Sequence, residues 1–484
     1  MNNDKLKNHI NGRSCDILGL GVSNLPLARR LCDMGVSLTV RDKAPMSALG
    51  NDAKALADAG VRFICGDGAF EHCESDIIFR SPGIRPDIKC IAAAKDRGAH
   101  LTGEIELFLE LCEAKTFGIT GSDGKTTSTT LTYRFLEADS ARTAHGKAYV
   151  GGNIGAPLLD RLSSIGKDDR VAIELSSFQL MTAHTSPTYS AITNISPNHL
   201  DWHRGMDEYI SAKLNIIGPQ TRRFVTNADC PTTAEIARKM ILGKGNDTAP
   251  PEIWLFSGTL EGFSAIFPEG ARENDRAIYV KDGYITVSDG KREERVLSVS
   301  DIRVPGKHNI ENFMTAIALT YGQVDASVYT EVAKDFRGVE HRLEHIRTLD
   351  GVDYYNSSID SSPTRTAAAL SALRGRDIVI ICGGYDKKIP FEPLADAIIG
   401  TVRAVVLTGA TADKIESAIL SHKDYACGAP EIRKISDFSD AVAEARTLAR
   451  AGGCVLLSPA CASFDAFKNF AERGRTFCDI VNNF

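Results

Sequence analysis

Short apolar runs of strand-forming residues recur along almost the whole chain, and stretches with a helical pattern separate them. Brief buried strands that alternate with helices are typical of parallel sheets covered on both faces. The sequence therefore predicts an α/β fold, and a chain of this length should hold about two to four domains. The expected strands span residues 15–19, 37–40, 76–79, 116–120, 170–173, 191–195, 377–381, 404–408 and 454–457.

One region, residues 252–304, breaks this pattern. It consists of short strands and turns, with the hairpin dipeptides Asp282-Gly283 and Asp289-Gly290. We expect a small antiparallel sheet here, and new series of strands begin near residues 103 and 338. The predicted domains are a Rossmann-like domain in residues 1–103, a P-loop ATPase-like domain with the antiparallel sheet in 104–338, and a second Rossmann-like domain in 339–484.

The composition argues against several classes of protein. The formal net charge is −6 in 484 residues, so no basic excess favours nucleic acid or an anionic membrane as a partner. Residues 1–13 are polar and lack the apolar stretch of a secretory signal. No apolar run approaches the ~20 residues of a membrane helix. The twelve cysteines include no CxxC pair, which indicates reduced thiols in a cytoplasmic protein.

The strongest local signal is the segment GITGSDGKTT, which follows an apolar strand and opens a helix. Its glycines allow backbone N–H groups to approach a phosphate, and the helix start adds partial positive charge. Ile119 stands where the strict motif has its first glycine, so a glycine turn before an ordinary helix is the alternative. Lys125 is expected to reach the ATP phosphates and Thr126 to bind Mg²⁺. The candidate ATP-binding residues are Gly121, Ser122, Asp123, Gly124, Lys125, Thr126 and Thr127.

A second glycine loop lies near the N-terminus, in CDILGLGVSNLPLARRLCDMGVSLTVRD. Gly19 and Gly21 follow a strand and precede a helix, and Asp42 lies where a ribose-binding acid belongs. Asn24 replaces the third glycine of the dinucleotide fingerprint. The loop therefore indicates some nucleotide rather than NAD, with a purely structural turn as the alternative. Two such loops suggest two different nucleotide ligands.

Two strand ends carry candidate cation ligands. Glu174 ends the strand in VAIELSSFQL, and His199 follows the next strand in AITNISPNHLDWH. Ligands of open α/β sheets bind at the carboxyl ends of strands, and Mg²⁺ prefers oxygen ligands. His199 could be a direct or an indirect ligand, or simply a structural residue. From its helical segment EYISAKLNII alone, Lys213 is only a helical lysine.

Taken together, the motifs resemble those of the Mur ligases. In order, they are GITGSDGKTT, ELSSFQL, NISPNHLDWH, SAK, GKHNIENFMTA, EHRLE, GGYDKKIPF and LLSPACASFDAFKNFAERG, and they span nearly the whole chain. GLGVSN, ELSSFQL and LLSPACASFDAF are most similar to the member that adds D-glutamate to UDP-N-acetylmuramoyl-L-alanine. The resemblance implies an ATP- and Mg²⁺-dependent amide ligase of peptidoglycan precursor synthesis. It also implies three domains, an acyl-phosphate intermediate and small-molecule substrates only, and we expect a monomer.

The resemblance also implies a role for individual residues. Lys213 matches the lysine that is N-carboxylated in the family and becomes a metal ligand, beside Thr126, Glu174 and His199. Arg342 would contact the ATP phosphates, and with Lys125, His199 and Lys213 it makes up the catalytic set. Asn309 and Asn312 match residues on the adenine side. The substrate-binding positions are Gly19, Ser23 and Asp42 for the uridine nucleotide, Asn153, Ser176 and Gln179 for the muramoyl-alanine part, and Lys387, Ser463 and Phe470 for D-glutamate.

Some positions depart from the family pattern. In the segment 356–362, Ser357 and Ile359 stand where many relatives have Asp and Lys, and Asp360 could supply the acid. Asn198 replaces a common Asp and Trp202 a common Arg. Three alternatives stay open: a sibling ligase that adds another amino acid, a nicotinamide-dependent dehydrogenase, and a non-catalytic nucleotide-binding regulator.

Overall fold

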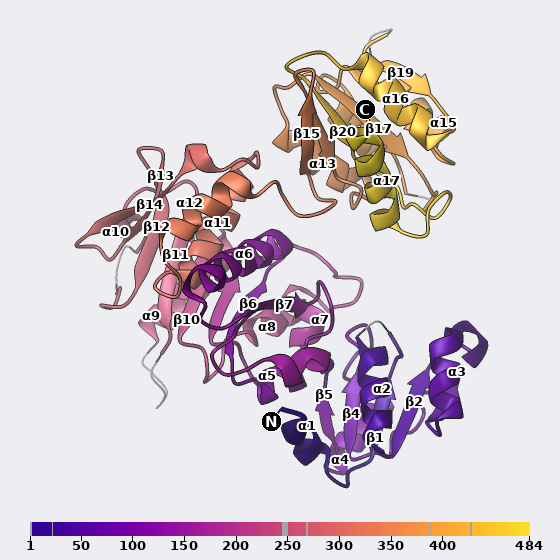
Figure 1. Ribbon diagram of the computed structural model, residues 1–484, viewed down its shortest axis with the longest axis vertical. Coiled ribbons are helices and arrows are strands. Elements are labelled where there is room, and N and C mark those ends of the chain that lie inside the picture. Colours follow the sequence, from indigo (N-terminus) through magenta and orange to yellow (C-terminus); the bar gives the residue numbers. More distant parts are fainter. Residues whose placement is uncertain (1, 22, 244–249, 268–269, 388, 426–427) are drawn as a thin grey trace. The chain divides into compact units, whose positions relative to one another are not determined.

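The computed structural model describes residues 2–21, 23–243, 250–267, 270–387, 389–425 and 428–484, so Val22 and Lys388, which fall within two of the motifs, lie outside the described residues. The described chain is an α/β protein with three sheets, which confirms the predicted fold class. All nine expected strands are present. In Figure 1, whose colours follow the sequence, the first sheet is indigo to purple, the central sheet magenta to pink, and the third orange to yellow.

The first sheet has the order β3-β2-β1-β4-β5 and is parallel throughout. Its strands are β1 (Cys15–Leu18), β2 (Leu38–Asp42), β3 (Arg62–Cys65), β4 (Ile77–Arg80) and β5 (His100–Thr102). The associated helices are α1 (Asn2–Ile10), α2 (Asn24–Asp33), α3 (Gly50–Asp58) and α4 (Lys89–Asp96). Every residue of β1 and β4 is buried, as expected for strands covered on both faces.

The central sheet has nine strands in the order β14-β13-β12-β11-β10-β9-β6-β8-β7. They are β6 (Lys115–Thr120), β7 (Ala148–Gly152), β8 (Arg170–Glu174), β9 (Tyr189–Ile192), β10 (Arg223–Asn227), β11 (Glu252–Ser257), β12 (Arg276–Lys281), β13 (Tyr284–Ser288) and β14 (Glu293–Ser298). The associated helices are α5 (Glu104–Leu111), α6 (Lys125–Thr143), α7 (Ser177–Leu180), α8 (Met206–Leu214), α9 (Pro231–Leu242), α10 (Phe263–Ile266), α11 (Lys307–Thr320) and α12 (Ser327–Asp335). Helix α6 packs against β6, β7 and β8 (Figure 1).

The antiparallel strands of residues 252–304 continue the central sheet instead of standing beside it. β11 pairs in parallel with both β10 and β12. Within this region only the pairs β12–β13 and β13–β14 are antiparallel. Asp282 and Gly283 join β12 to β13 with φ values of 49° and 76°, as a tight hairpin turn requires. The hairpins were visible in the sequence, but the pairing of β11 with β10 was not.

The third sheet has the order β15-β16-β20-β17-β18-β19. Its strands are β15 (Glu344–Leu349), β16 (Val352–Asn356), β17 (Ile378–Gly383), β18 (Ala404–Thr408), β19 (Glu431–Lys434) and β20 (Cys454–Leu457). Only β15, at one edge, is antiparallel to its neighbour. The helices are α13 (Pro363–Ala372), α14 (Glu392–Ile398), α15 (Ala412–Leu420), α16 (Phe438–Leu448) and α17 (Phe470–Asn482).

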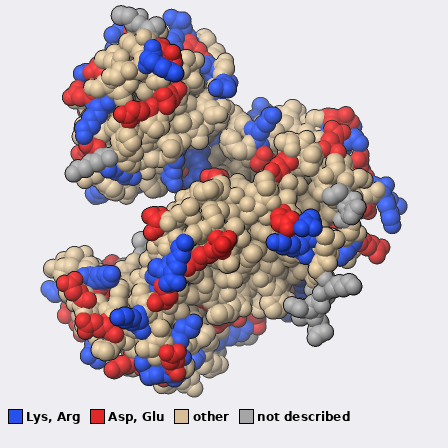
Figure 2. Space-filling model, turned by 180° about the vertical axis from the view of Figure 1, so that it is seen from behind, with Lys and Arg blue, Asp and Glu red and all other residues tan. Residues whose placement is uncertain are grey.

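The chain packs as two compact units, residues 1–301 with 310–332, and residues 302–309 with 333–484. The first two sheets share one unit because a continuous hydrophobic core runs through both, with Leu107, Phe108 and Leu109 of α5 among its members. The proposed boundaries near residues 103 and 338 stay predictions. No helix in the described part of the chain is both long and apolar enough to cross a membrane. Figure 2 shows acidic and basic side chains intermingled on the face in view.

Candidate functional site

The central glycine loop joins β6 to α6 in a conformation that only glycine fits. Gly121 has a φ of 147°, and Gly124, which precedes the first turn of α6, has a φ of 79°. A Cβ atom on Gly121 would lie 1.9 Å from Thr193 Oγ1, and one on Gly124 would lie 2.4 Å from Asn312 Oδ1. The loop thus has both the backbone conformation and the tight packing of a phosphate cradle at a helix start.

A neighbouring strand end holds this loop in place. The backbone N–H of Ser122 donates to the carbonyl of Asn194 at 2.9 Å, and that of Asp123 donates to Asn194 Oδ1 at 3.0 Å. The hydroxyl of Thr193 donates to the carbonyl of Asp123. Asn312 Oδ1 accepts from Ser128 on α6 at 3.1 Å, which places α11 behind the loop. Asn194 was noted in the sequence only as part of a motif, and its role in the loop was missed.

Two lysine ammonium groups reach this loop. Lys125 Nζ donates to the carbonyl of Ser122 at 2.9 Å, and Lys213 Nζ donates to the carbonyl of Gly121 at 2.7 Å. Lys213 is only 1% exposed and also lies over the ring of Tyr209. Burial, and then the charge of Lys125, lower the pKa of Lys213 to about 7. A lysine with that pKa is partly neutral at pH 7, which makes it nucleophilic.

Glu174 ends β8 beside the loop, because its register partner on β6 is Ile119. The residue is 2% exposed, and one carboxylate oxygen accepts from Asn153 Nδ2 at 2.8 Å. The other oxygen, Oε2, is buried with no hydrogen-bond partner. An unsatisfied buried carboxylate oxygen is costly, and a cation would satisfy it. The free oxygen of Glu174 therefore fits an oxygen-preferring ion such as Mg²⁺, and Thr126, in the first turn of α6, offers a hydroxyl of the same donor type.

The other predicted metal ligand, His199, lies on the loop after β9. It is exposed, it has a φ of 55°, and its ring packs against Phe178 with centroids 4.9 Å apart. Positive φ in a non-glycine residue is strained and often occurs at functional sites. Among the described residues, the only three His, Cys, Asp or Glu donors close enough for one ion lie elsewhere in the chain. His199 and Glu174 therefore do not form a closed cage with a third such side chain.

Two predicted substrate residues, Ser176 and Gln179, cap a helix. Gln179 Oε1 accepts from the backbone N–H of Ser176 at 2.9 Å, and the Ser176 hydroxyl accepts from the backbone N–H of Gln179, which makes a capping box for α7. Gln179 also lines a small cavity with Ser23, Arg80 and Thr182. The structure thus brings one residue predicted for the uridine end and one predicted for the muramoyl end to the same cavity.

The N-terminal glycine loop is held differently. Asp42 Oδ2 accepts from the backbone N–H of Leu20 at 2.8 Å, and its Oδ1 accepts from that of Ala44 at 2.9 Å. Asn24, the residue in place of the third glycine, is buried and donates to the carbonyl of Gly19 at 2.9 Å. Gly19 has a φ of 82°. The loop of the first sheet is therefore held by an acid and an amide, with Ser23 at the start of α2.

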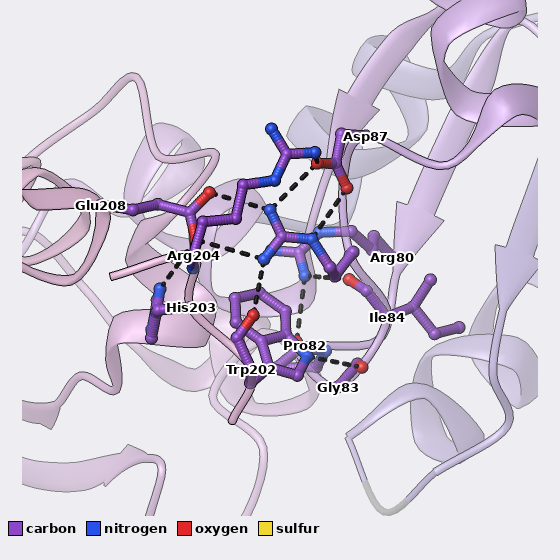
Figure 3. A network of polar contacts seen from close by, with 10 residues as sticks. Arg80, Pro82, Gly83, Ile84, Asp87, Trp202, His203, Arg204 and Glu208 are labelled. Atoms are coloured by element: carbon purple, nitrogen blue, oxygen red, sulfur yellow. Dashed lines mark hydrogen bonds and ion pairs between the residues drawn. The ribbon is translucent and has the colours of Figure 1, made fainter. Parts of the chain in front are cut away.

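A polar network that sequence reasoning missed joins the first sheet to the central one (Figure 3). Arg85 donates to Glu208 on α8 at 2.8 Å and to the carbonyl of Trp202 at 2.7 Å. Arg85 also pairs with Asp87, which Arg204 contacts in turn. The hydrogen bonds from Arg85 lower the pKa of Glu208 to about 2, so its carboxylate stays charged. The indole N–H of Trp202 donates to the carbonyl of Gly83.

A second arginine supports the same junction. Arg80 is buried and donates to the carbonyls of Ile84 at 2.6 Å and Phe178 at 2.7 Å. Burial lowers its pKa to about 10, and burial raises the pKa of the nearby Glu106 to about 8. The visible signal was an arginine at the end of the apolar strand IIFR, a position where a charged group is uncommon.

The remaining predicted residues, apart from Asn312, belong to the second unit. Arg342 lies between His341 and Leu343, whose φ values of 64° and 44° mark a strained loop. Lys387 Nζ donates to the carbonyl of Ser361 at 3.3 Å. Asn309 donates to the carbonyl of Pro305, Ser463 is buried in the connection between β20 and α17, and the exposed Phe470 begins α17.

Asp360, suggested as a substitute acid, is buried in this unit. It accepts from Ser458 Oγ at 2.8 Å, and burial raises its pKa. The suggestion that Asp360 supplies the acid of the family pattern stays a prediction. Lys387 contacts the segment 356–362 directly, because its ammonium group donates to the carbonyl and the hydroxyl of Ser361.

Comparisons with known proteins define the class. The family model described as the Mur ligase middle domain matches residues 119–320, and the model described as Mur ligase, glutamate ligase domain, matches residues 341–461. Solved structures of similar fold include a UDP-N-acetylmuramoyl-L-alanyl-D-glutamate–2,6-diaminopimelate ligase, with a TM-score of 0.55 and 15% identity over 92% of this chain and 93% of that one. Another is a MurF ligase from Thermotoga maritima in complex with ADP, with a TM-score of 0.51 and 14% identity over 92% and 94%. At such identities these structures show the fold alone.

The matches to the two family models define the class of this chain as a ligase, and the lysine-bearing glycine loop at the start of α6 agrees with that class. Its family follows from closer relatives, both named UDP-N-acetylmuramoylalanine–D-glutamate ligase. The protein from Acetivibrio thermocellus is 41% identical over 99% of this chain and 98% of its own length. The one from Symbiobacterium thermophilum is 42% identical over 96% and 97%. The chain belongs to the Mur ligase family, which confirms the resemblance drawn from its motifs.

Proposed function

We propose that this ligase joins the amino group of D-glutamate to the alanyl carboxyl group of UDP-N-acetylmuramoyl-L-alanine, with ATP and Mg²⁺, in peptidoglycan precursor synthesis. The observation that carries the proposal is the full-length identity of about two residues in five to relatives named for that reaction. The two-lysine loop beside an unsatisfied buried carboxylate supports the use of ATP and a cation.

The proposed reaction has two steps. The alanyl carboxylate oxygen attacks the γ-phosphorus of ATP and expels ADP, which leaves an acyl phosphate. The neutral amine of D-glutamate then attacks the acyl carbon, an amide bond forms, phosphate leaves, and the amine loses a proton. A free carboxylate is a poor electrophile, so this activation is needed. Lys125 and Arg342 would neutralise charge on the transferring group, where preorganised positive charge contributes most.

The residues around the loop are suited to hold Mg²⁺. Thr126 and Glu174 would bind the ion and His199 would act at its edge, and bound Mg²⁺ supplies further positive charge to the phosphates. Lys213 fits a third ligand, because its partly neutral amine can attack CO₂ and lose a proton to form a carbamate. Its burial and its pKa of about 7 support that step. The carbamate would turn a buried cation into an anionic oxygen ligand.

The substrates would lie along the predicted positions. Gly19, Ser23 and Asp42 would bind the uridine nucleotide, and Asn153, Ser176 and Gln179 would border the muramoyl-alanine part. Asn309 and Asn312 would lie on the adenine side, and Lys387, Ser463 and Phe470 around D-glutamate. We propose that the enzyme works as a monomer in the cytoplasm, where ATP is available and its cysteines stay reduced, on small molecules alone.

Phosphate release tests the proposal directly. The purified chain is given ATP, Mg²⁺ and UDP-N-acetylmuramoyl-L-alanine with D-glutamate, L-glutamate, L-lysine, meso-diaminopimelate or no amino acid. We expect release with D-glutamate alone and a product heavier by one glutamyl residue. Release with another amino acid would make the chain a sibling ligase. No release with any of them would favour a nucleotide-binding regulator.

A further inference from the structure

Three metal-binding side chains that the proposed reaction does not use converge where α1, β5 and α5 meet. His9 comes from α1, His100 begins β5, and Glu110 lies near the end of α5. One donor atom of each lies within 4.8 Å of the other two. His100 Nε2 and Glu110 Oε1 are 4.0 Å apart, too far for a hydrogen bond but near enough to share an ion. No other such group occurs among the residues that the structure describes.

One ring nitrogen of each imidazole group lacks a hydrogen-bond partner. Nε2 of His9 and Nε2 of His100 are both buried, and neither has a hydrogen-bond partner. Their rings meet edge to face, with centroids 5.7 Å apart. Two buried nitrogens left unsatisfied in one place are uncommon and need an explanation.

The chemistry of the three donors selects a class of ion. Two imidazole nitrogens and one carboxylate oxygen suit Zn²⁺ and other first-row dications, with a position left open for water. Mg²⁺ prefers oxygen ligands alone. We propose that His9, His100 and Glu110 form a binding site for a first-row transition-metal dication, separate from the proposed Mg²⁺ site and independent of the ligase reaction.

A bound ion would join three segments that are distant in the sequence. Helix α1 packs against α5, and Gly103 separates β5 from α5. Helix α5 belongs to the core that the first and central sheets share. Metal bonds of about 2.0–2.2 Å would draw the three side chains closer together. The ion would therefore fix the N-terminal helix to the junction of the two sheets and raise the thermal stability of the first unit.

Zinc binding to the full-length chain tests the proposal. The protein, free of any histidine tag, is titrated with Zn²⁺ in a calorimeter with Mg²⁺ in large excess, which saturates the oxygen site. The variants are His9→Gln, His100→Gln and Glu110→Gln, and the controls are His72→Gln and His145→Gln, which change exposed histidines. Circular dichroism without metal checks folding, and Glu110→Gln is the safest variant because Glu110 lies at the surface.

We expect one equivalent of Zn²⁺ to bind and to raise the thermal midpoint. Loss of a residue that only orients a ligand weakens metal binding by ~10–100-fold, so loss of a ligand should weaken it by at least ~100-fold in each of the three variants. The controls should match the wild type. Substituted Co²⁺ should show visible bands without thiolate charge transfer. No tight site in the wild type, equal binding in the variants, or thiolate bands would overturn the proposal, whatever the outcome of the ligase assay.

Discussion

The two glycine loops share a local design but differ in charge. Each follows a buried parallel strand and precedes a helix. In the first loop, Asp42 accepts two backbone N–H groups and Asn24 closes the turn, whereas in the central loop Lys125 and Lys213 donate to backbone carbonyls. A loop with a lysine at its helix start suits a triphosphate, and a loop closed by an acid suits the hydroxyl groups of a ribose. We therefore expect the side chains around a glycine loop, more than its glycines, to determine which nucleotide it binds.

The largest expected effect comes from removing the cation at the start of α6. Lys125→Ala should lower kcat by ~10²–10³-fold or more, because a preorganised charge on the transferring phosphoryl group is lost. ADP release measures this, and circular dichroism checks the fold. Lys115→Ala, an exposed lysine on the strand before the loop, is the matched control and should keep full activity. Full activity in Lys125→Ala would contradict the assignment of the central loop to the ATP phosphates.

Lys213 is expected to act as a carbamate, and an added carboxylate should rescue part of the activity that is lost when it is removed. Lys213→Ala should lose most activity and regain part of it when acetate supplies a carboxylate oxygen near the same place. Lys213→Arg keeps a charge but cannot be carboxylated, so acetate should not help it. The readout is ADP release against acetate concentration. An unmodified lysine in the mass spectrum of fully active enzyme would contradict the carbamate.

The stability of the junction between the first and central sheets is expected to depend on pH. Glu106 holds a proton more tightly when folded, because burial raises its pKa from 4.5 to about 8. The folded state therefore binds more protons between those values. The stabilisation is fully present below pH 4.5 and is lost as pH rises through 8. Glu106→Gln should flatten this dependence and be more stable than the wild type by ~1–3 kcal/mol at pH 8.5. Urea unfolding at several pH values measures it, and identical slopes would refute it.

The smallest effect concerns the contact between the domains of the two loops. Arg85→Ala breaks the bidentate pair with Glu208 on the helix that carries Lys213. We expect kcat/KM for the UDP substrate to fall by ~10–100-fold, since a partly buried charge-assisted pair is worth ~1.5–3 kcal/mol. Binding of ATP alone should not change. Arg29→Ala, which breaks an exposed pair with Asp52, is the control. An equal loss in both variants would count against a specific role for this pair.

The sequence predicted what depends on local patterns. Buried strands show as apolar runs, and glycines that need positive φ show at strand ends, so the nine strands and the central loop could be located from them. The S-x-x-Q pattern of Ser176 and Gln179 is the sequence signature of the capping box of α7, and their predicted contact with the muramoyl-alanine part stays a prediction. Recognition of the motifs supplied the reaction, which no spacing could show.

Properties set by distant contacts could not be read from the sequence. Lys213 is one polar residue of helix α8, and its burial depends on how α8 packs under the loop. The pairing of β11 with β10 and the link between Arg85 and Glu208 join segments far apart in the chain. The contact of Asn24 with Gly19 explains in retrospect how the fingerprint tolerates the loss of its third glycine.

The central claim is that each loop binds its own nucleotide, and separate binding titrations test it most directly. Wild type, Lys125→Ala and Asp42→Ala are titrated with a non-hydrolysable ATP analogue and Mg²⁺, and separately with UDP-N-acetylmuramoyl-L-alanine. Loss of a charged hydrogen-bonding group should weaken binding by ~10–100-fold. We predict that Lys125→Ala weakens only the ATP analogue and Asp42→Ala only the UDP substrate. If either variant weakens both ligands equally, or the effects are exchanged, the assignment of the loops is wrong.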